Sequence, residues 1–467
     1  MKRTTALISG VALMGVLAAL TGCSGAADHS ASKPGTDSTL TVWSLEEQPD
    51  RLAKAQADAT SFTQKTGIKV KLVGVNEDQF PQLITAAAAS NTLPDVVGAL
   101  PLAAVRTMSG NELVNSDAMA RVVDELGAGT FSTASLALTK DGDKQVGVPS
   151  DGFPLSIIYR KDVLAQAGLP EPKDWPTLLS DAEALNSPSM AGFVAGDSPS
   201  TSYTQQIFEW LALANGCQLV DGSGKVALTS TACVDAFDWY GRLTHDYSVP
   251  GAMDSTSTKT TYMAGKAAIT VWASFILDEM GGLVNDAKPT CPQCASDPQF
   301  IAKNSGFVTM FSGPDGGAPV AGGDVTSWVI SSTANSGAAE KFVEYFMGDG
   351  YEQWLSQAPE GKFPTRLGTK SAPNSYVDQW KKLQVGVDSK AQLTSIYPES
   401  VIDSLQSGVG SFDRWAFTQK QGDLAGAILT ELPVPKAVAE VATGQAGAKA
   451  AAQQAQKQVE SIQASLR

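Results

Sequence analysis

The order of strand and helix patterns between residues 39 and 97 is the feature that most constrains the fold. Apolar residues alternate along 39–44 and 68–73, and Asp95-Val96-Val97 fits a third short strand. Between these segments, apolar residues recur at helical spacing along 52–62 and 80–87. A strand–helix–strand–helix–strand order implies a parallel sheet with helices on its faces. The sequence therefore predicts an α/β protein.

The N-terminus is typical of an exported chain. Lys2 and Arg3 precede an almost wholly apolar run at 6–20, which small residues follow, as in a secretory signal peptide. Leu20-Thr21-Gly22-Cys23 resembles the bacterial lipobox, in which the cysteine is lipidated and the chain is cut before it. This resemblance implies a signal peptide at 1–22 and a lipid on Cys23. The alternative is an ordinary cleaved signal with a chance cysteine.

The segment at 23–38 is small and polar, so it buries little and is expected to be a disordered tether. Removal of residues 1–22 takes away two cations and no acid, so the net charge changes from −14 to −16. Nucleic-acid binding proteins present a basic surface, and this charge argues against such a partner. It weakly favours a neutral or cationic ligand.

The remaining cysteines are even in number, and an exported chain permits disulfides. Of their three possible pairings we favour the two local ones, Cys217–Cys233 and Cys291–Cys294. Cys291-Pro-Gln-Cys294 could instead be a redox or metal motif. A zinc site would need two further soft or imidazole ligands, and only two histidines, at 29 and 245, exist. We expect no metal and no cofactor.

Several stretches, taken in chain order, carry a resemblance to a known family. They are Thr41-Val42-Trp43, Phe62 to Val70, Leu93-Pro94-Asp95-Val96-Val97, Gly147-Val148-Pro149, Tyr159 to Leu169, Pro170 to Leu178, Tyr262 to Ile269, Gly322-Gly323 before Trp328, and Glu360 to Arg366. Together they resemble the extracellular solute-binding proteins of sugar importers, the maltose-binding-like group. Arg160 stands where that family usually has asparagine, and Asp174 where it often has threonine.

The resemblance implies a two-lobed α/β fold of the periplasmic-binding-protein type, with the ligand in the cleft between the lobes. One lobe would take 39–149 with 312–348, and the other 150–311 with 349–467. A monomer of this kind would capture a mono-, di- or oligosaccharide outside the cell. It would be lipid-anchored to the outer face of the cell membrane and deliver the sugar to the permease subunits of an ABC importer.

A sugar site needs aromatic rings for the C–H faces of the sugar and charged or amide groups for its hydroxyls. Open α/β sheets bind ligands at strand ends and in the loops that follow them, so these residue types are candidates where they occur there. The resemblance adds that the family often stacks a sugar on an aromatic residue at the end of the strand 266–272. The predicted ligand-binding residues are Trp43, Glu46, Asp151, Tyr203, Trp272, Asp324 and Arg366.

Four of these residues also have a purely structural interpretation. Trp43 could pack on its own loop, and Asp151 could bond its own backbone in a turn. Asp324 follows Gly322-Gly323, which could admit a ligand close to the backbone or simply form a tight turn. Arg366 could hold hydroxyls in a bidentate manner or bridge to an acid.

An enzyme is the main competing class. We find no Gly-x-Ser-x-Gly elbow, no His-Glu-x-x-His and no phosphate-binding Gly-x-x-x-x-Gly-Lys-Ser/Thr loop. A secreted glycoside hydrolase needs only two suitably placed carboxylates, which a sequence does not exclude. That hydrolase, or a binding protein for a non-sugar solute such as a peptide, is the alternative. The order of the family-like stretches favours a binding protein without catalytic activity.

Overall fold

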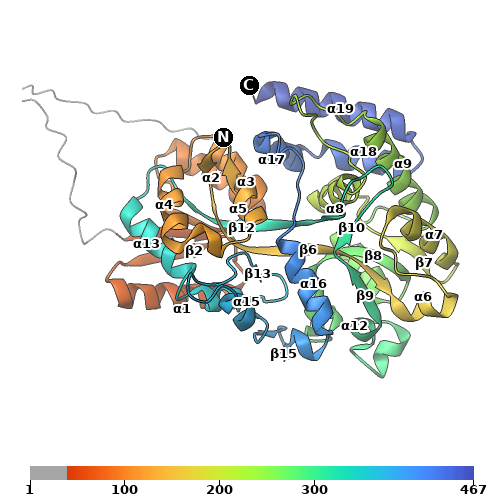
Figure 1. Ribbon diagram of the computed structural model, residues 1–467, viewed down its shortest axis with the longest axis horizontal. Helices are drawn as coiled ribbons and strands as arrows, with labels where there is room; N and C mark the ends of the chain where they lie inside the picture. Colours follow the sequence, from red (N-terminus) through yellow and green to blue (C-terminus); the bar gives the residue numbers. More distant parts are fainter. Residues whose placement is uncertain (1–38, 467) are drawn as a thin grey trace, which may run out of the picture. The chain divides into compact units, whose positions relative to one another are not determined.

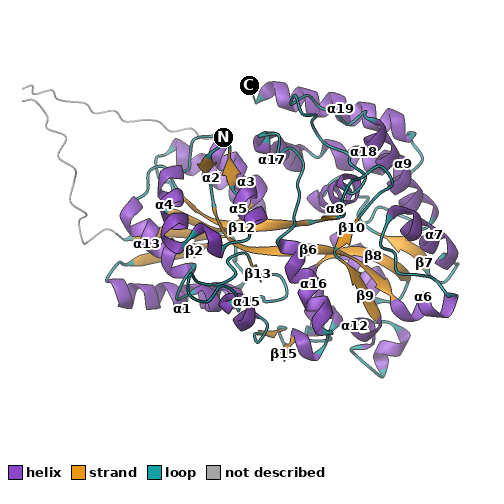
Figure 2. Ribbon diagram, in the orientation of Figure 1, coloured by secondary structure: helices purple, strands orange, loops and turns teal. Residues whose placement is uncertain are grey.

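A nine-stranded sheet organises the part of the chain that the computed structural model describes, residues 39–466 (Figure 1). The strand order is β2-β1-β3-β12-β6-β8-β7, and β13 and β9 also pair with β6. Figure 2 shows helices on both sides of this sheet. The predicted signal peptide, the tether and the lipidation site Cys23 lie outside the described residues.

The first part of the sheet has the predicted parallel arrangement. β1 (Leu40–Ser44) pairs in parallel with β2 (Val70–Gly74) on one side and with β3 (Val96–Pro101) on the other. α1 (Pro49–Thr66) connects the first two strands, and α2 (Phe80–Ala89) lies before the third. The α/β class is confirmed, and the carboxyl ends of these strands lie at one edge.

The strand β6 (Val148–Arg160) connects the two parts of the sheet. Its first half pairs antiparallel with β12 (Gly323–Ile330), and its second half pairs with β8 (Ala267–Ala273) and β9 (Ser305–Val308). Taken alone, the sequence patterns at 145–149 and 155–159 predict two separate strands, and this prediction is wrong because β6 is continuous. The strand changes its neighbours between Pro154 and Leu155, so the intervening turn-like residues interrupt its pattern without ending it.

Further helices cover the faces and ends of the sheet, and short strands complete the structure. The helices are α3 (Leu102–Gly110), α4 (Ser116–Leu126), α5 (Thr133–Leu138), α6 (Lys161–Ala167), α7 (Trp175–Leu185), α8 (Ser202–Leu213), α9 (Thr231–Asp246), α10 (Ser255–Met263), α11 (Leu277–Met280), α12 (Phe300–Asn304), α13 (Ser336–Phe346), α14 (Tyr351–Leu355), α15 (Ser375–Trp380), α16 (Glu399–Val409), α17 (Gly422–Glu431), α18 (Pro433–Ala442) and α19 (Ala448–Ser465). The other strands are β4 (Lys140–Asp141), β5 (Lys144–Gln145), β7 (Ala191–Val194), β10 (Met310–Phe311), β11 (Val320–Ala321), β13 (Phe363–Pro364), β14 (Gln384–Val385) and β15 (Ala391–Gln392).

The buried apolar side chains form two clusters. One includes residues of β1, β3, β12 and α13, with Trp328 packed against Phe342 and Phe346. The other includes α7, α8, α9, α18 and α19, where the rings of Trp175 and Trp239 stack 4.3 Å apart. The sheet runs through both clusters, while the predicted lobe boundaries at 149, 311 and 348 stay predictions.

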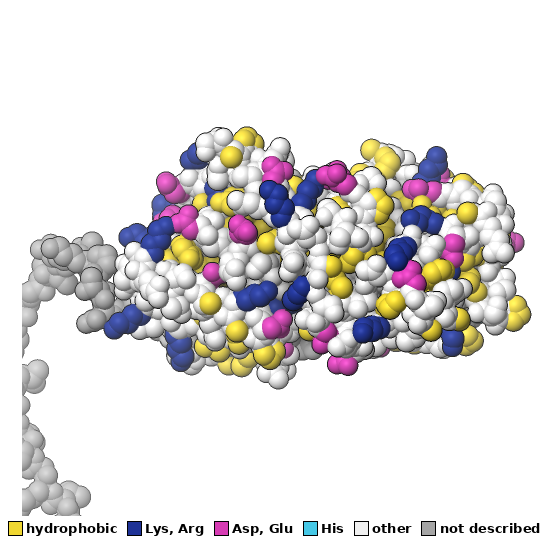
Figure 3. Space-filling model, turned by 90° about the horizontal axis from the view of Figure 1, so that it is seen from below, with side chains coloured by type: hydrophobic (Ala, Val, Ile, Leu, Met, Phe, Trp, Pro, Cys, Tyr) yellow, Lys and Arg dark blue, Asp and Glu magenta, His cyan; other side chains and the backbone are white. Residues whose placement is uncertain are grey.

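Both favoured disulfides are present, Cys217–Cys233 and Cys291–Cys294, which confirms the predicted pairing. Within residues 39–466, no helix combines the length and the apolar character that a membrane crossing requires. On the face seen in Figure 3, Lys and Arg side chains lie among Asp and Glu side chains and do not gather into one basic patch.

Candidate functional site

A cavity of about 410 Å³ lies at the ends of the strands in the middle of the sheet. Its walls come from the loop after β1, the end of β3, the middle of β6, the start of β12, α8 and the segment after β8. The position agrees with the rule that open α/β sheets bind ligands beyond the carboxyl ends of their strands. Its chemically informative residues are Glu46, Arg51, Asp151, Phe153, Gln206, Phe275, Asp324 and Thr326.

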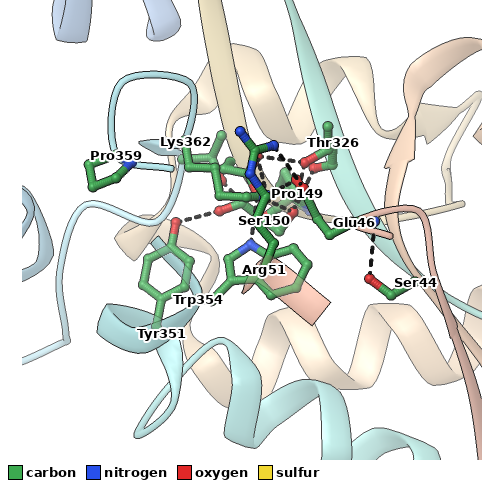
Figure 4. A network of polar contacts seen from close by, with 12 residues as sticks. Ser44, Glu46, Arg51, Pro149, Ser150, Thr326, Tyr351, Trp354, Pro359 and Lys362 are labelled. Carbon is green, nitrogen blue, oxygen red and sulfur yellow. Dashed lines mark hydrogen bonds and ion pairs between the residues drawn. The ribbon is translucent and has the colours of Figure 1, made fainter. Parts of the chain in front are cut away.

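Glu46 is held by two cations. Its Oε1 lies 2.6 Å from Nζ of Lys362, and its Oε2 accepts a hydrogen bond of 3.0 Å from Nη1 of Arg51 (Figure 4). Burial alone would raise the pKa of this carboxyl, but Lys362 and Arg51 outweigh it and lower the pKa to about 2. Glu46 therefore stays ionised at any physiological pH.

Asp151 lies behind Glu46 and is almost fully buried. Nε1 of Trp354 donates a hydrogen bond of 2.6 Å to Oδ1, and Oγ1 of Thr326 donates one of 2.8 Å to Oδ2. Nζ of Lys362 lies 3.6 Å from Oδ2 and 4.2 Å from the centre of the Trp354 ring. The ammonium group of Lys362 thus lies between two carboxylates and is attracted by both, and Asp151 helps to hold this ammonium group in position.

Asp324 forms the opposite wall of the cavity. Its Oδ1 lies 3.2 Å from Nη1 of Arg414 and accepts a hydrogen bond of 2.8 Å from the Val325 N–H. Arg414 in turn donates a hydrogen bond of 2.7 Å to Glu209. Burial raises the pKa of Asp324, and the charge of Arg414 opposes that shift. The carboxyl group is held in place by a buried arginine and can accept hydrogen bonds from a ligand.

Two half-buried aromatic rings give the cavity an apolar surface. The centres of the Phe153 and Phe275 rings are 5.5 Å apart, and the guanidinium of Arg51 lies 5.9 Å from the centre of the Phe275 ring. A side chain on Gly361 would collide with Phe275, because an added Cβ would lie 1.8 Å from its Cε1. The glycine therefore makes room for this ring.

Three of the seven predicted binding residues come together in the cavity: Glu46, Asp151 and Asp324. Tyr203 and Trp272 contact each other, with ring centres 4.6 Å apart, and the Tyr203 hydroxyl donates a hydrogen bond of 2.6 Å to the Val271 carbonyl. Trp43 packs against the first hydrophobic cluster. These three aromatic residues are outside the lining of the cavity, and their role in binding stays a prediction.

Arg366 also lies away from the cavity. Its guanidinium donates hydrogen bonds to the carbonyls of Leu126 and Met347 and to Oγ1 of Thr130. These hydrogen bonds connect segments of the chain that are far apart in sequence, so Arg366 stabilises the fold. Its role in ligand binding stays a prediction without support from this placement.

The paired glycines before Asp324 leave space for two aromatic side chains. A Cβ on Gly322 would lie 2.3 Å from Cγ of Trp210, and one on Gly323 would lie 2.2 Å from Cζ of Phe412. The sequence suggested that a ligand could approach the backbone here, or that the pair forms a tight turn. The structure instead fills the space with the two rings.

Arg51, Lys362 and Phe275 are cavity or network residues that the sequence reasoning missed. Lys362 lies in the stretch that resembles the family, four residues before Arg366, and the argument from bidentate geometry favoured the arginine. Phe275 lies three residues beyond Trp272, just after the strand that was examined. Arg51 lies in the first turn of α1, five residues after Glu46, and no regular spacing joins the two residues.

The sequence matches a known family over most of its length. The profile of the family described as "Bacterial extracellular solute-binding protein" matches residues 57–383. The chain belongs to that family. YcjN of Escherichia coli (strain K12), a candidate ABC transporter periplasmic-binding protein, is 31% identical over 305 residues. That alignment covers 64% of this chain and 66% of YcjN, slightly less than two thirds.

Solved structures of solute-binding proteins share the fold. The GacH receptor of Streptomyces glaucescens, determined unliganded and with acarbose, has a TM-score of 0.66 at 18% identity, covering 91% of this chain and 98% of its own. Maltose-bound MalE3 of T. maritima has a TM-score of 0.65 at 16% identity, covering 91% and 99%. These matches show the fold, and the two-lobed architecture of periplasmic binding proteins is thereby confirmed for this member of the family.

Proposed function

We propose that this solute-binding protein captures a carbohydrate in the cavity between β1, β6 and β12. The observation that carries the proposal is the composition of the walls: ionised Glu46 and buried Asp324 face the space together with Arg51 and the rings of Phe153 and Phe275. Carboxylates and a guanidinium form hydrogen bonds with hydroxyl groups, and aromatic rings pack against the C–H faces of a sugar. The solved relatives named above, which were determined with acarbose and with maltose, support this class of ligand.

The ligand would hold the two lobes together. Glu46 and Arg51 lie at the start of the chain, whereas Phe275 follows β8 in the other part of the sheet. A ligand that contacts both sets of residues stabilises the closed arrangement, because it binds that arrangement better than an open one. Closure would present the loaded protein to the permease subunits of an ABC importer.

A thermal-shift screen of residues 39–467 tests the proposal. The panel holds mono-, di- and oligosaccharides, with amino acids, short peptides and metal ions as controls. A ligand that binds only the folded protein raises Tm, by an amount that grows with its concentration over Kd. A shift with one class of sugar supports the proposal; a shift only with peptides or amino acids overturns it.

Two aromatic variants decide which ring stacks on the sugar. Phe275→Ala should weaken binding of the sugar found in the screen about tenfold or more, because the ring lines the cavity. Trp272→Ala, which removes a ring outside the lining, should leave Kd within about twofold. Calorimetric titration measures both, and circular dichroism checks folding. The reverse result would restore Trp272 as the stacking residue and move the site.

We further infer that the protein binds its ligand without converting it and is a monomer lipid-anchored through Cys23. Incubation with chromogenic glycosides checks the first point, and steady release of the chromophore contradicts it. Sedimentation equilibrium gives the oligomeric state. Expression of the full chain beside Cys23→Ser, with separation of membranes from the medium, tests the anchor: only the Cys23→Ser protein should leave the membrane fraction.

A further inference from the structure

A second cavity of about 370 Å³ adjoins the first. Leu45, Pro101, Gln206 and Asp324 line both of them, so the two spaces are parts of one cleft. Asp324 stands where they meet. We call the second space the apolar arm and define it by Phe80, Pro81, Ile84, Ala103, Ala104 and Leu429.

The walls of the apolar arm come from helices far apart in the sequence. α2 and α3 supply one wall, and α17 supplies the other. α17 lies directly on α3, because Gly426 has no side chain: an added Cβ would lie 3.0 Å from the Ala103 carbonyl oxygen. Figure 1 shows α17 beside α3. A group in the arm would therefore contact both the beginning and the end of the folded chain.

The chemistry of the arm differs from that of the first cavity. The first cavity combines charged side chains with two half-buried rings. Of the residues that line the arm alone, Thr107, Ser202 and Thr430 carry hydroxyl groups and the rest are apolar. Phe80 is only 2% exposed, so it offers little ring surface for stacking. A sugar ring placed there would meet hydroxyl groups of Thr107, Ser202 and Thr430 in place of the charged side chains of the first cavity, and most of the wall would face it with apolar groups. An aliphatic group would instead gain by leaving water.

We propose that the natural ligand is a glycoside or acylated sugar whose alkyl or acyl group occupies the apolar arm. The inference rests on the proposed function, because the sugar part occupies the first cavity. Asp324, at the junction, would bond the sugar hydroxyl nearest to the apolar substituent. The arm thus selects for what is attached to the sugar, and the first cavity selects for the sugar itself.

Paired glycosides test this proposal. Calorimetric titration compares the methyl and hexyl glycosides of glucose, galactose, mannose, xylose and maltose. For the sugar that binds, the hexyl glycoside should bind at least about tenfold more tightly than the methyl glycoside, since five further methylene groups enter the arm. If methyl glycosides bind and hexyl glycosides gain nothing, this inference is overturned and the proposed function stands. If neither kind binds, both are overturned.

Two leucine variants locate the effect. Leu429→Asn places an amide in the wall of the arm, and it should weaken binding of the hexyl glycoside at least about tenfold more than that of the methyl glycoside. Leu83→Asn is the matched control, because Leu83 lies on α2 but is 40% exposed and outside the arm. It should alter neither affinity. Equal losses for both glycosides in Leu429→Asn would contradict a separate subsite for the alkyl group.

Discussion

The carboxyl groups of Glu46 and Glu360 are both buried near Arg51, yet their pKa values shift in opposite directions. Two cations contact Glu46 and lower its pKa to about 2 despite the burial. Burial and the nearby charge of Asp278 raise the pKa of Glu360, and Arg51 opposes this shift without forming an ion pair with it. The difference shows that direct contact with a cation, and not burial alone, decides which carboxyl stays charged.

Three consecutive residues produce this difference. Lys362 contacts Glu46, Gly361 packs on the ring of Phe275, and Glu360 senses the charge of Asp278. Residues 359–361 form a turn that leads into β13, and the side chains on the two sides of Gly361 meet different charged groups. The segment 360–362 thus supplies a buried cation to Glu46, leaves room for the ring of Phe275 and holds a carboxyl whose pKa is raised. Substitutions at each of the three positions test this assignment.

Lys362→Met should have the largest effect. It removes the cation that Glu46 and Asp151 share, so Asp151 loses its ion pair and Glu46 keeps only Arg51. The loss should lower the free energy of unfolding by about 3–5 kcal/mol, as measured by urea denaturation at pH 7. A loss below about 1 kcal/mol would show that Arg51 alone suffices for Glu46.

The matched control for this variant is Lys65→Met. Lys65 also pairs with a carboxylate, that of Asp349, but its side chain is 61% exposed. Its replacement should leave the free energy of unfolding nearly unchanged, because water screens this exposed pair. Adding Glu46→Gln to Lys362→Met should recover part of the lost stability, since one of the two affected charges is removed. No recovery would mean that Lys362 stabilises the fold mainly through its packing on Trp354.

Gly361→Ala should have the next largest effect. The new methyl group would overlap the Phe275 ring and force a shift of the ring or of the backbone, at a cost of about 1–3 kcal/mol. Adding Phe275→Ala should remove most of that cost, which a double-mutant cycle in urea measures. Gly317→Ala is the control, because an added Cβ there would meet nothing within 4 Å. Additive losses in the cycle would contradict the contact.

The sequence predicted more of the fold than of the site, and the reason is physical. Periodicity at 39–97 is a local property, and it gave the parallel strands and their helices. Glu46 and Asp324 could be predicted because each directly follows or begins a strand at the cavity edge. Lys362 could not, because nothing near it in sequence shows that it meets Glu46, 316 positions earlier. Arg366 has the same local pattern as a ligand residue and yet binds backbone carbonyls.

Glu360→Gln should have the smallest effect, and it depends on pH. The pKa of Glu360 is raised in the folded protein, so the folded state holds a proton that the unfolded state releases above its ordinary value of 4.5. The stabilisation that Glu360 contributes is therefore fully present below its ordinary pKa of 4.5, and it is lost as the pH rises from there toward the pKa in the folded protein. Glutamine carries no charge in either state, so the variant lacks this loss.

The difference in Tm between Glu360→Gln and the unchanged protein should accordingly grow as the pH rises from 5 to 9. Near pH 5 the two should melt together, and at pH 9 the variant should melt higher by about 2–4 °C for each kcal/mol recovered. Glu352→Gln, which alters an exposed carboxylate of α14, should show no such trend. A constant difference at all pH values would mean that Glu360 is ionised in the folded protein. Arg51 would then stabilise the ionised forms of both Glu46 and Glu360, and the difference between these two carboxyl groups would disappear.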